Sequence, residues 1–157
     1  MRITVISDSH RGFSAAERAI GAQPNSKHVI FLGDGLNNVV DLQYVFPDRQ
    51  FYFVRGNCDY NNNYKSSNMI ILENTAIFFT HGHNYGVKYG LSAFTTAARE
   101  KQAKIALYGH THKPEIHYDD GLYILNPGSI TSNSCGKNSY AVIDITKAGI
   151  LPNIIFV

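Results

Sequence analysis

The stretch Ile3-Thr4-Val5-Ile6-Ser7-Asp8-Ser9-His10 joins a short apolar run to a polar cluster. The run is rich in β-branched residues and short enough for a buried strand. Asp8 and His10 therefore lie just beyond the C-terminal end of that strand. Four later apolar runs also end in polar clusters, namely Gly33-Asp34-Gly35, Gly56-Asn57-Cys58-Asp59, His81-Gly82-His83 and Gly109-His110-Thr111-His112.

The recurrence of these clusters predicts one shared site. Open α/β sheets bind ligands along the edge where strands end, because the loops converge there while the sheet holds them rigid. A carboxylate can bridge two divalent cations, and imidazoles and amide oxygens complete their coordination. We expect Asp34 to be the bridge, Asp8 and His10 to reach one metal, and His110 and His112 to divide between the two.

Each motif alone is weak evidence, because a single Asp-x-His or Gly-Asp-Gly is usually an ordinary turn. However, five of the seven histidines lie in the strand-end clusters. Two cations about 3.5–4 Å apart would lower the pKa of a bridging water to about 7. The resulting hydroxide could attack phosphorus in line, and the cations would stabilise charge on the phosphoryl oxygens. The sequence thus predicts phosphoryl hydrolysis without a protein nucleophile.

Composition excludes several classes. With 157 residues, 44% hydrophobic and 17% charged, the chain is expected to form a single domain, residues 1–157. The formal charge of +2, without a dense basic run, argues against stable nucleic-acid binding. We find no signal-like start and no apolar stretch long enough to span a membrane. Cys58 and Cys135 are too few for a disulfide framework, so we expect a cytoplasmic protein.

The pattern between the clusters predicts an α/β fold. Residues 13–22 have helical apolar spacing, with Ser14 and Glu17 matching a capping box. A second helix is expected over 37–45, before Pro47. The first three strands should therefore be parallel. The remaining expectations are a hairpin of 69–72 with 76–80, a helix within 91–104, and a mostly antiparallel last third with strands at 115–118, 122–125, 139–145 and 150–157.

The five clusters, in this order, resemble those of the calcineurin-like metallophosphoesterases. The short length, the cysteine in Gly56-Asn57-Cys58-Asp59 and the later Asn126-Pro127-Gly128-Ser129 are most similar to the small YfcE-type phosphodiesterases. The resemblance covers nearly the whole chain. It implies a four-layer αββα sandwich and phosphodiester hydrolysis by a metal-bridging hydroxide.

The resemblance also implies a ligand set. The first metal would be bound by Asp8, His10, Asp34 and His112, and the second by Asp34, Asn57, His81 and His110. His83 would either orient a ligand, which we favour, or touch the substrate phosphate, and Asp59 would orient a ligand. We expect two divalent ions, with Mn²⁺ as the first choice and Ni²⁺, Fe²⁺ or Zn²⁺ as alternatives.

Two positions depart from the family pattern. Cys58 stands where many members have a histidine thought to help the leaving group, so we expect a preference for diesters and activated aryl esters over alkyl monoesters. We expect Cys58 to be an inert packed thiol, with a soft metal ligand as the alternative. No arginine follows Ser129, where related proteins often have one. Lys137 is a weaker substitute, and Arg11 and Arg55 are alternative phosphate contacts.

The first expectation is therefore a metal-dependent phosphodiesterase acting on a small phosphodiester. The alternatives are a nucleotide phosphatase or nuclease of the same superfamily, and a non-catalytic scaffold on this fold. Substitution of Asp34 or His81 separates these classes, because an enzyme would lose turnover while a scaffold would keep its partner. Related small phosphoesterases also suggest a homo-oligomer, either a dimer or a tetramer.

Overall fold

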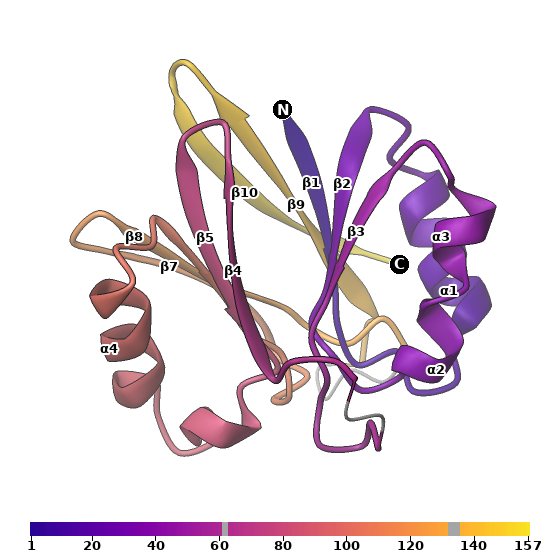
Figure 1. Cartoon of the computed structure of the whole chain (residues 1–157), viewed down its shortest axis with the longest axis horizontal. Helices are drawn as coiled ribbons and strands as arrows, with labels where there is room; N and C mark the ends of the chain where they lie inside the picture. Colours follow the sequence, from indigo (N-terminus) through magenta and orange to yellow (C-terminus); the bar gives the residue numbers. More distant parts are fainter. Residues whose placement is uncertain (61–62, 132–135) are drawn as a thin grey trace.

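The computed structural model describes residues 1–60, 63–131 and 136–157. Two five-stranded sheets face one another (Figure 1), with strand orders β10-β9-β1-β2-β3 and β4-β5-β6-β8-β7. The strands of the first sheet are β1 (Arg2–Ile6), β2 (Ser26–Phe31), β3 (Gln50–Phe53), β9 (Ser139–Thr146) and β10 (Gly149–Phe156). Those of the second are β4 (Ser67–Leu72), β5 (Thr75–Thr80), β6 (Ile105–Leu107), β7 (Pro114–Asp119) and β8 (Leu122–Pro127).

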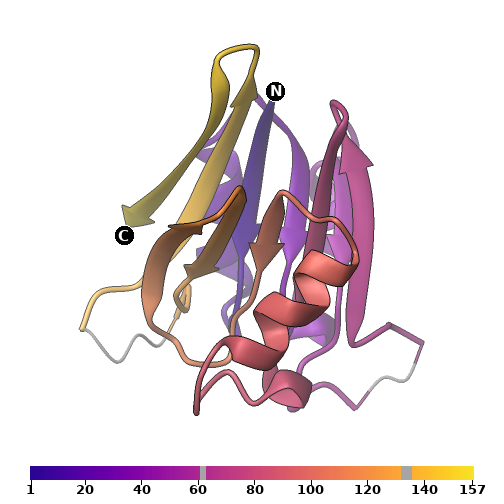
Figure 2. The ribbon, with the colours of Figure 1, turned by 90° about the vertical axis from the view of Figure 1, so that its left-hand side faces the viewer.

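Helices cover the outer face of each sheet (Figures 1 and 2). On the first sheet they are α1 (Phe13–Gly21), α2 (Leu36–Val39) and α3 (Leu42–Val45). On the second they are α4 (Ser92–Glu100) and the short 3₁₀ helix η1 (His83–Tyr85). The order helix, sheet, sheet, helix confirms the predicted αββα sandwich. No helix within the described ranges is long and apolar enough to cross a membrane.

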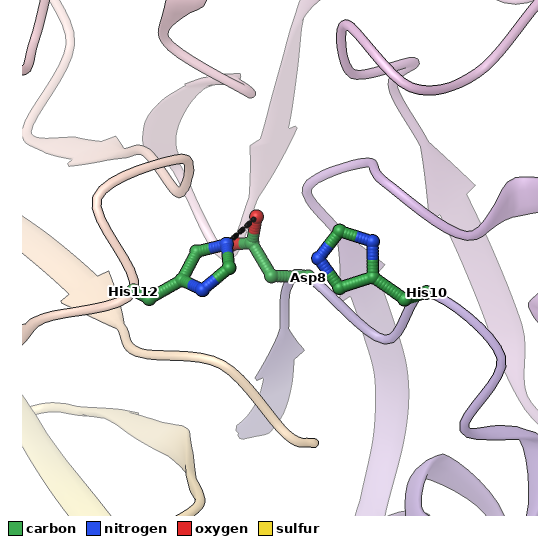
Figure 3. A group of neighbouring side chains, drawn as sticks. All are labelled: Asp8, His10 and His112. Carbon is green, nitrogen blue, oxygen red and sulfur yellow. Dashed lines mark ion pairs between the residues drawn. The ribbon is translucent and has the colours of Figure 1, made fainter. Parts of the chain in front are cut away.

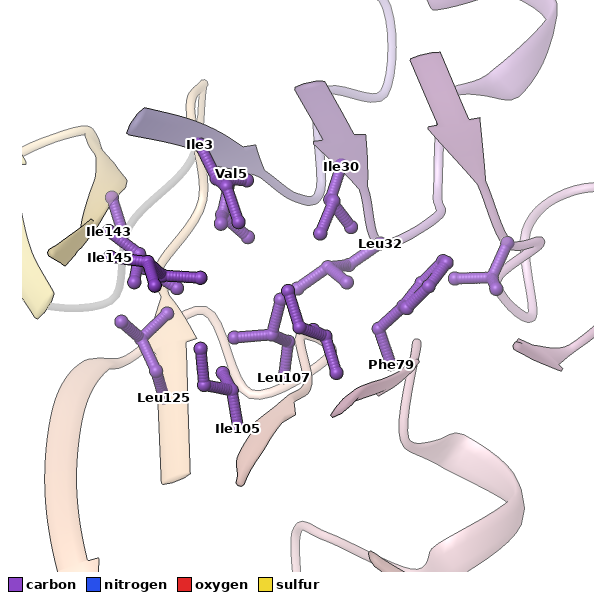
Figure 4. Packing of buried hydrophobic residues seen from close by; sticks show 13 residues of the cluster. Ile3, Val5, Ile30, Leu32, Phe79, Ile105, Leu107, Leu125, Ile143 and Ile145 are labelled. Atoms are coloured by element: carbon purple, nitrogen blue, oxygen red, sulfur yellow. The ribbon is translucent and has the colours of Figure 1, made fainter. Parts of the chain in front are cut away.

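The main core lies between the two sheets (Figure 4). Ile3 and Val5 of β1 point into it, opposite residues of the second sheet such as Leu107. Ile6, on the other side of the same strand, packs in the layer under the helices. Because successive residues of a strand face opposite sides, a strand covered on both faces must be apolar almost throughout. This burial explains the short apolar runs and fixes where each one ends.

The pairing confirms most of the predicted topology. β1, β2 and β3 are parallel neighbours, and β4 and β5 form the expected hairpin. β7 with β8 and β9 with β10 are antiparallel, as predicted for the last third of the chain. The sequence did not predict that β8 would pair in parallel with β6. The parallel strands of both sheets send their C-terminal ends toward one edge, where the polar clusters follow.

Two details of the helix prediction are wrong. The capping box of Ser14 and Glu17 does not form, because α1 begins at Phe13, its N-cap is Gly12, and no side chain caps it. Both residues therefore lie inside the helix. The helix expected over 37–45 is instead two short helices separated by a turn at residues 40–41.

Candidate metal centre

The loops that carry the predicted ligands are tied together through their backbones. Asp8 N donates to Gly33 O at 3.0 Å, and His10 N donates to Asp34 O at 2.8 Å. In the second sheet, Gly109 N donates to His81 O at 3.0 Å. Neighbouring parallel strands thus bring residues far apart in sequence to one edge. The position of each ligand loop depends on that of the next.

Most of the predicted ligands adopt an unusual backbone conformation. The residues with left-handed φ angles include Asp8 at 52°, His10 at 46°, Asp34 at 60°, His110 at 68° and His112 at 58°. This region is sterically unfavourable for residues other than glycine. Such strain costs about 1–3 kcal/mol per residue, persists only where the surrounding structure enforces it, and clusters at functional sites. The five side chains are therefore held in place at a cost to stability.

The first group of side chains consists of Asp8, His10 and His112 (Figure 3), whose ligand atoms all lie within 4.8 Å of one another. His112 Nε2 is 3.1 Å from Asp8 Oδ1. The His10 and His112 rings have centroids 5.5 Å apart. The two rings come from different sheets. Asp8 and His10 follow β1 of the first sheet, whereas His112 follows β6 of the second.

The second group centres on His81, whose side chain is fully buried. His81 Nε2 lies 3.4 Å from Asp34 Oδ2, 3.1 Å from Asn57 Oδ1 and 3.1 Å from His110 Nδ1. Its other ring nitrogen, Nδ1, donates to Leu32 O at 2.9 Å. This bond fixes the ring orientation and leaves Nε2 facing the acidic groups, as is usual for a metal-binding histidine.

Asp8 provides a test of whether cations fit here. Its side chain is fully buried, and Oδ2 accepts bonds from Ser7 Oγ at 2.5 Å and from His110 N at 3.1 Å. Oδ1 has no hydrogen-bond partner among the described residues, although it faces His112 and lies 4.0 Å from His81 Nε2. A buried carboxylate oxygen without a hydrogen bond is costly unless a cation compensates it. The mixed carboxylate, imidazole and amide set also suits divalent ions.

Burial and neighbouring charges shift the pKa values of several side chains in the cluster. Burial alone would lower the pKa of His81, but the hydrogen bond to Asp34 and the charges of Asp8 and Asp34 raise it overall. Burial would raise the pKa of Asp34. The hydrogen bond and charge of His81, together with the hydrogen bond from the Cys58 N–H, outweigh burial and hold this pKa well below its ordinary value. Burial and the neighbouring His81 lower the pKa of His110 to about 4. Positive charge is thus favoured beside the two carboxylates.

Two glycines are required by close packing around the carboxylates. A Cβ at Gly56 would lie 2.0 Å from Asp34 Oδ1. At Gly109 it would lie 2.0 Å from Ser7 Oγ and 2.9 Å from Asp8 Oδ2. Contacts this short cannot exist, so any side chain would displace the carboxylates. This explains why glycine precedes both Asn57 and His110.

Asp59 holds two loops together. Its Oδ2 accepts from Asp34 N at 2.7 Å and Gly56 N at 2.9 Å, while Oδ1 accepts from Gly35 N at 2.8 Å and Leu36 N at 2.9 Å. Both oxygens are therefore committed to backbone donors. This geometry matches a carboxylate that orients the Asp34 and Asn57 loops.

The other predicted site residues lie at the border of the cluster. The half-buried His83 ring is 5.4 Å from that of His81, and burial followed by the His81 charge lowers the pKa of His83. Arg55 also lowers this pKa, so it lies close enough to act on the same region. Arg11 is exposed and lines a cavity with His10. Lys137 is exposed, and residues 132–135, including Cys135, lie outside the described part.

The expectation that Cys58 is a packed thiol is wrong, because Cys58 is exposed. Cys58 lies in a tight turn, where its N–H donates to Asp34 Oδ1 at 2.8 Å. The Cys58 sulfur, a ring nitrogen of His10 and a carboxylate oxygen of Asp34 all lie within 4.8 Å of one another. Partial shielding of the sulfur from water by the surrounding loops, followed by its hydrogen bond to Asp34, raises the pKa of this otherwise exposed thiol to about 11. The thiol therefore stays protonated near neutral pH.

Sequence reasoning missed the residues that support the ligand loops from behind. Asn126 Nδ2 donates to Gly109 O at 3.0 Å, and Ser129 Oγ donates to Asp8 O at 2.8 Å. Both belong to Asn126-Pro127-Gly128-Ser129, a turn that the sequence predicted and whose resemblance to other proteins it showed, but without indicating these bonds. The chemical signal was present, since small polar residues in a turn after a buried strand commonly bond to neighbouring backbone.

Comparisons with known proteins agree with this geometry. A family model described as the calcineurin-like phosphoesterase superfamily domain matches residues 1–148. The probable metallophosphoesterase YsnB of Bacillus subtilis is 29% identical over 149 residues, covering 92% of this chain and 85% of the relative. Phosphodiesterase YfcE of Escherichia coli K12 is 29% identical over 168 residues, covering 92% and 88%.

Solved structures show the same fold. A predicted phosphoesterase from Streptococcus pneumoniae TIGR4 superposes with a TM-score of 0.85 at 26% identity, covering 99% of this chain and 88% of that one. The YfcE structure gives a TM-score of 0.70 at 26% identity, covering 92% and 88%. The resemblance inferred from the five clusters is thereby confirmed.

Proposed function

Since the chain belongs to the calcineurin-like phosphoesterase superfamily, we propose that it is a dinuclear metal-dependent phosphodiesterase. The observation that carries this proposal is the convergence of the buried carboxylates of Asp8 and Asp34 with His81, all within 4.8 Å. A buried acidic pair of this kind needs positive charge to offset it. The proposed ligands of the two cations are Asp8, His10, Asp34, Asn57, His81, His110 and His112.

Within this set, Asp34 is the proposed bridge. Its Oδ1 is held by the Cys58 N–H, and its Oδ2 faces His81. Asp8 and the rings of His10 and His112 form one side of the centre, and Asn57, His81 and His110 form the other. This division is supported by the distances within each group and by the fixed orientation of the His81 ring.

When bound, two divalent cations supply an acidic water for in-line attack and stabilise charge on the phosphoryl oxygens. The chain's own residues position the reacting groups. Asp59 holds the loops of Asp34 and Asn57 in place. His83 borders the centre and either orients a ligand or contacts the phosphate, and Arg11 and Arg55 supply positive charge for the substrate.

Cys58 bears on the choice of substrate. A general acid works best with a pKa near the operating pH, and a cysteine thiol is a poorer proton donor there than the imidazole that many members of the family carry at this position. The leaving group must therefore depart with little help from position 58. This supports a small phosphodiester or an activated aryl ester as the substrate, in preference to an alkyl phosphomonoester.

Manganese is our first choice of metal, because mixed nitrogen and oxygen sites accept Mn²⁺ readily, and Ni²⁺, Fe²⁺ and Zn²⁺ are the alternatives. We also propose a cytoplasmic enzyme in one domain, with a dimer or tetramer as the form in solution. The reducing cytoplasm is supported by the low cysteine count of two.

The test is hydrolysis of bis(p-nitrophenyl) phosphate by metal-free protein supplied with Mn²⁺, Ni²⁺, Zn²⁺, Mg²⁺ or no metal. We expect turnover that depends on metal and exceeds turnover of the corresponding monoester. Asp34→Asn should abolish it, whereas the exposed control Asp41→Asn should retain it. Metal-dependent monoester preference would favour a phosphatase. Absence of turnover with every ion, in folded protein, would favour a scaffold.

A further inference from the structure

A cavity opens directly beside the proposed metal centre, on its His10 side. Its volume is about 420 Å³. This is within the range of small-ligand sites, which are usually about 300–1,000 Å³. The other residues that line it include Arg11, Asn37, Asn38 and Tyr60. A phosphate at the metal centre would therefore have one of its ester arms next to this cavity.

Several side chains that line the cavity are exposed and free to contact a ligand. Tyr60 is 89% exposed, so its ring face is available. Asn37 is exposed, and no hydrogen bond engages its amide in the described part of the chain. Arg11 likewise has no ion pair among the described residues. Asn38 differs, because its Nδ2 donates to His10 O at 2.6 Å and supports the ligand loop.

The cavity carries little opposing charge. Asp59 also lines it, but both Asp59 carboxylate oxygens accept backbone N–H bonds. The charge left to meet a ligand is that of the exposed Arg11. This favours a ligand that is anionic near the metal centre and neutral further out.

The three available groups match the parts of a nucleotide. An exposed aromatic ring stacks on a flat base, and such stacking is tolerant of base identity. A carboxamide presents a donor and an acceptor side by side, the pattern that pairs with a base edge. A guanidinium suits a phosphate. An aliphatic arm would use none of these groups.

We propose that this cavity holds the nucleoside arm of a phosphodiester whose phosphate lies at the metal centre, and this inference rests on the proposed function. Tyr60 stacks on the base, Asn37 bonds to its edge, and Arg11 contacts the phosphate from the cavity side. The substrate class is thus a nucleoside phosphodiester. Tyr60 and Asn37 determine specificity and take no part in the hydrolytic step.

The test compares two diesters with the same leaving group, thymidine 5′-(p-nitrophenyl phosphate) and methyl p-nitrophenyl phosphate. Wild-type protein should have a kcat/KM at least about tenfold higher for the nucleoside ester, in line with the typical effect of one stacked base. Tyr60→Ala should lower kcat/KM for the nucleoside ester about tenfold. Its kcat/KM for the methyl ester should stay within about twofold of the wild-type value. Tyr60→Phe should retain the preference, because it keeps the ring face.

The matched control is Tyr89→Ala, which removes a tyrosine that is 97% exposed but does not line the cavity. It should leave kcat/KM unchanged for both substrates. Asn37→Ala should lower kcat/KM several-fold for the nucleoside ester alone. Equal kcat/KM for the two diesters in wild-type protein would overturn the inference, as would an equal loss of kcat/KM for both diesters in Tyr60→Ala. Either result would leave the proposed diesterase function intact.

A binding measurement separates failure of this inference from failure of the proposed function. Calorimetric titration compares thymidine 5′-monophosphate with inorganic phosphate, each in the presence of Mn²⁺. If neither diester is hydrolysed, the proposed function fails. Tighter binding of the nucleotide, lost in Tyr60→Ala and kept in Tyr60→Phe, would still support the nucleoside site. Equal affinity for the two ligands would overturn it.

Discussion

Replacement of Asp59 by asparagine tests how the two central loops are held. The carboxylate accepts four backbone N–H bonds, two on each oxygen, from residues 34, 35, 36 and 56. An amide of the same shape has only one oxygen, so two of these N–H groups lose their acceptor and face an NH₂ group. The two remaining bonds also lose their charge.

The expected cost follows from these contacts. An N–H group left without a partner on burial costs about 1–3 kcal/mol, so two of them cost about 2–6 kcal/mol. A domain of ordinary stability has only about 5–15 kcal/mol in total. Because the loops also carry Asp34 and Asn57, metal affinity should fall about 10–100-fold, the usual effect of losing an orienting partner.

The assay is equilibrium urea denaturation of metal-free Asp59→Asn, followed by calorimetric titration with Mn²⁺. The control is Asp41→Asn, an exposed aspartate on the outer helical layer. An unchanged denaturation midpoint together with weaker metal binding would indicate that Asp59 binds metal directly. An unchanged midpoint, with or without weaker metal binding, would refute the reasoning about the four backbone bonds.

Three further substitutions test other parts of the structure. Leu107→Ala, at a fully buried position between the sheets, should lower the free energy of unfolding by about 2–5 kcal/mol in urea, and a loss below about 1 kcal/mol would contradict the packing. Gly109→Ala should weaken Mn²⁺ binding at least about tenfold by calorimetry, because its Cβ would displace Ser7 and the carboxylate beside it; unchanged affinity would count against that clash. Asp144→Asn should cost about 1 kcal/mol at pH 7, because Arg2 donates two hydrogen bonds to this carboxylate at 2.9 and 2.8 Å. These bonds and the Arg2 charge lower the pKa of Asp144, so the difference in unfolding free energy should be fully present above about pH 4 and diminish as the pH falls further, and a difference that grew on acidification would contradict this sign.

The order of strands and polar clusters could be predicted because it depends on short, local patterns. A run such as residues 3–6 must be apolar when both faces of its strand are covered, and the residue after it is the first that can be polar. Parallel pairing then brings Asp8, Asp34 and His81 to one edge. The sequence therefore predicted the fold and the side chains that meet.

The features that were missed depend on contacts that local patterns do not encode. Ser129 supports the loop of Asp8 across 121 positions of sequence, and no periodicity signals such a bond. Cys58 was expected to be buried from the general behaviour of cysteine, but the turn that directs its N–H to Asp34 leaves the residue exposed. Ser14 matched a capping box by spacing alone, whereas the helix begins just before it.

The central claim is that Asp8 and Asp34 belong to one centre that holds two cations. The most direct measurement is the number of Mn²⁺ ions bound per chain, determined by equilibrium dialysis and elemental analysis, with electron paramagnetic resonance to detect coupling between them. We expect two ions per chain with an exchange-coupled signal, and loss of that coupling in Asp34→Asn. A single uncoupled ion per wild-type chain at saturation would contradict the dinuclear centre.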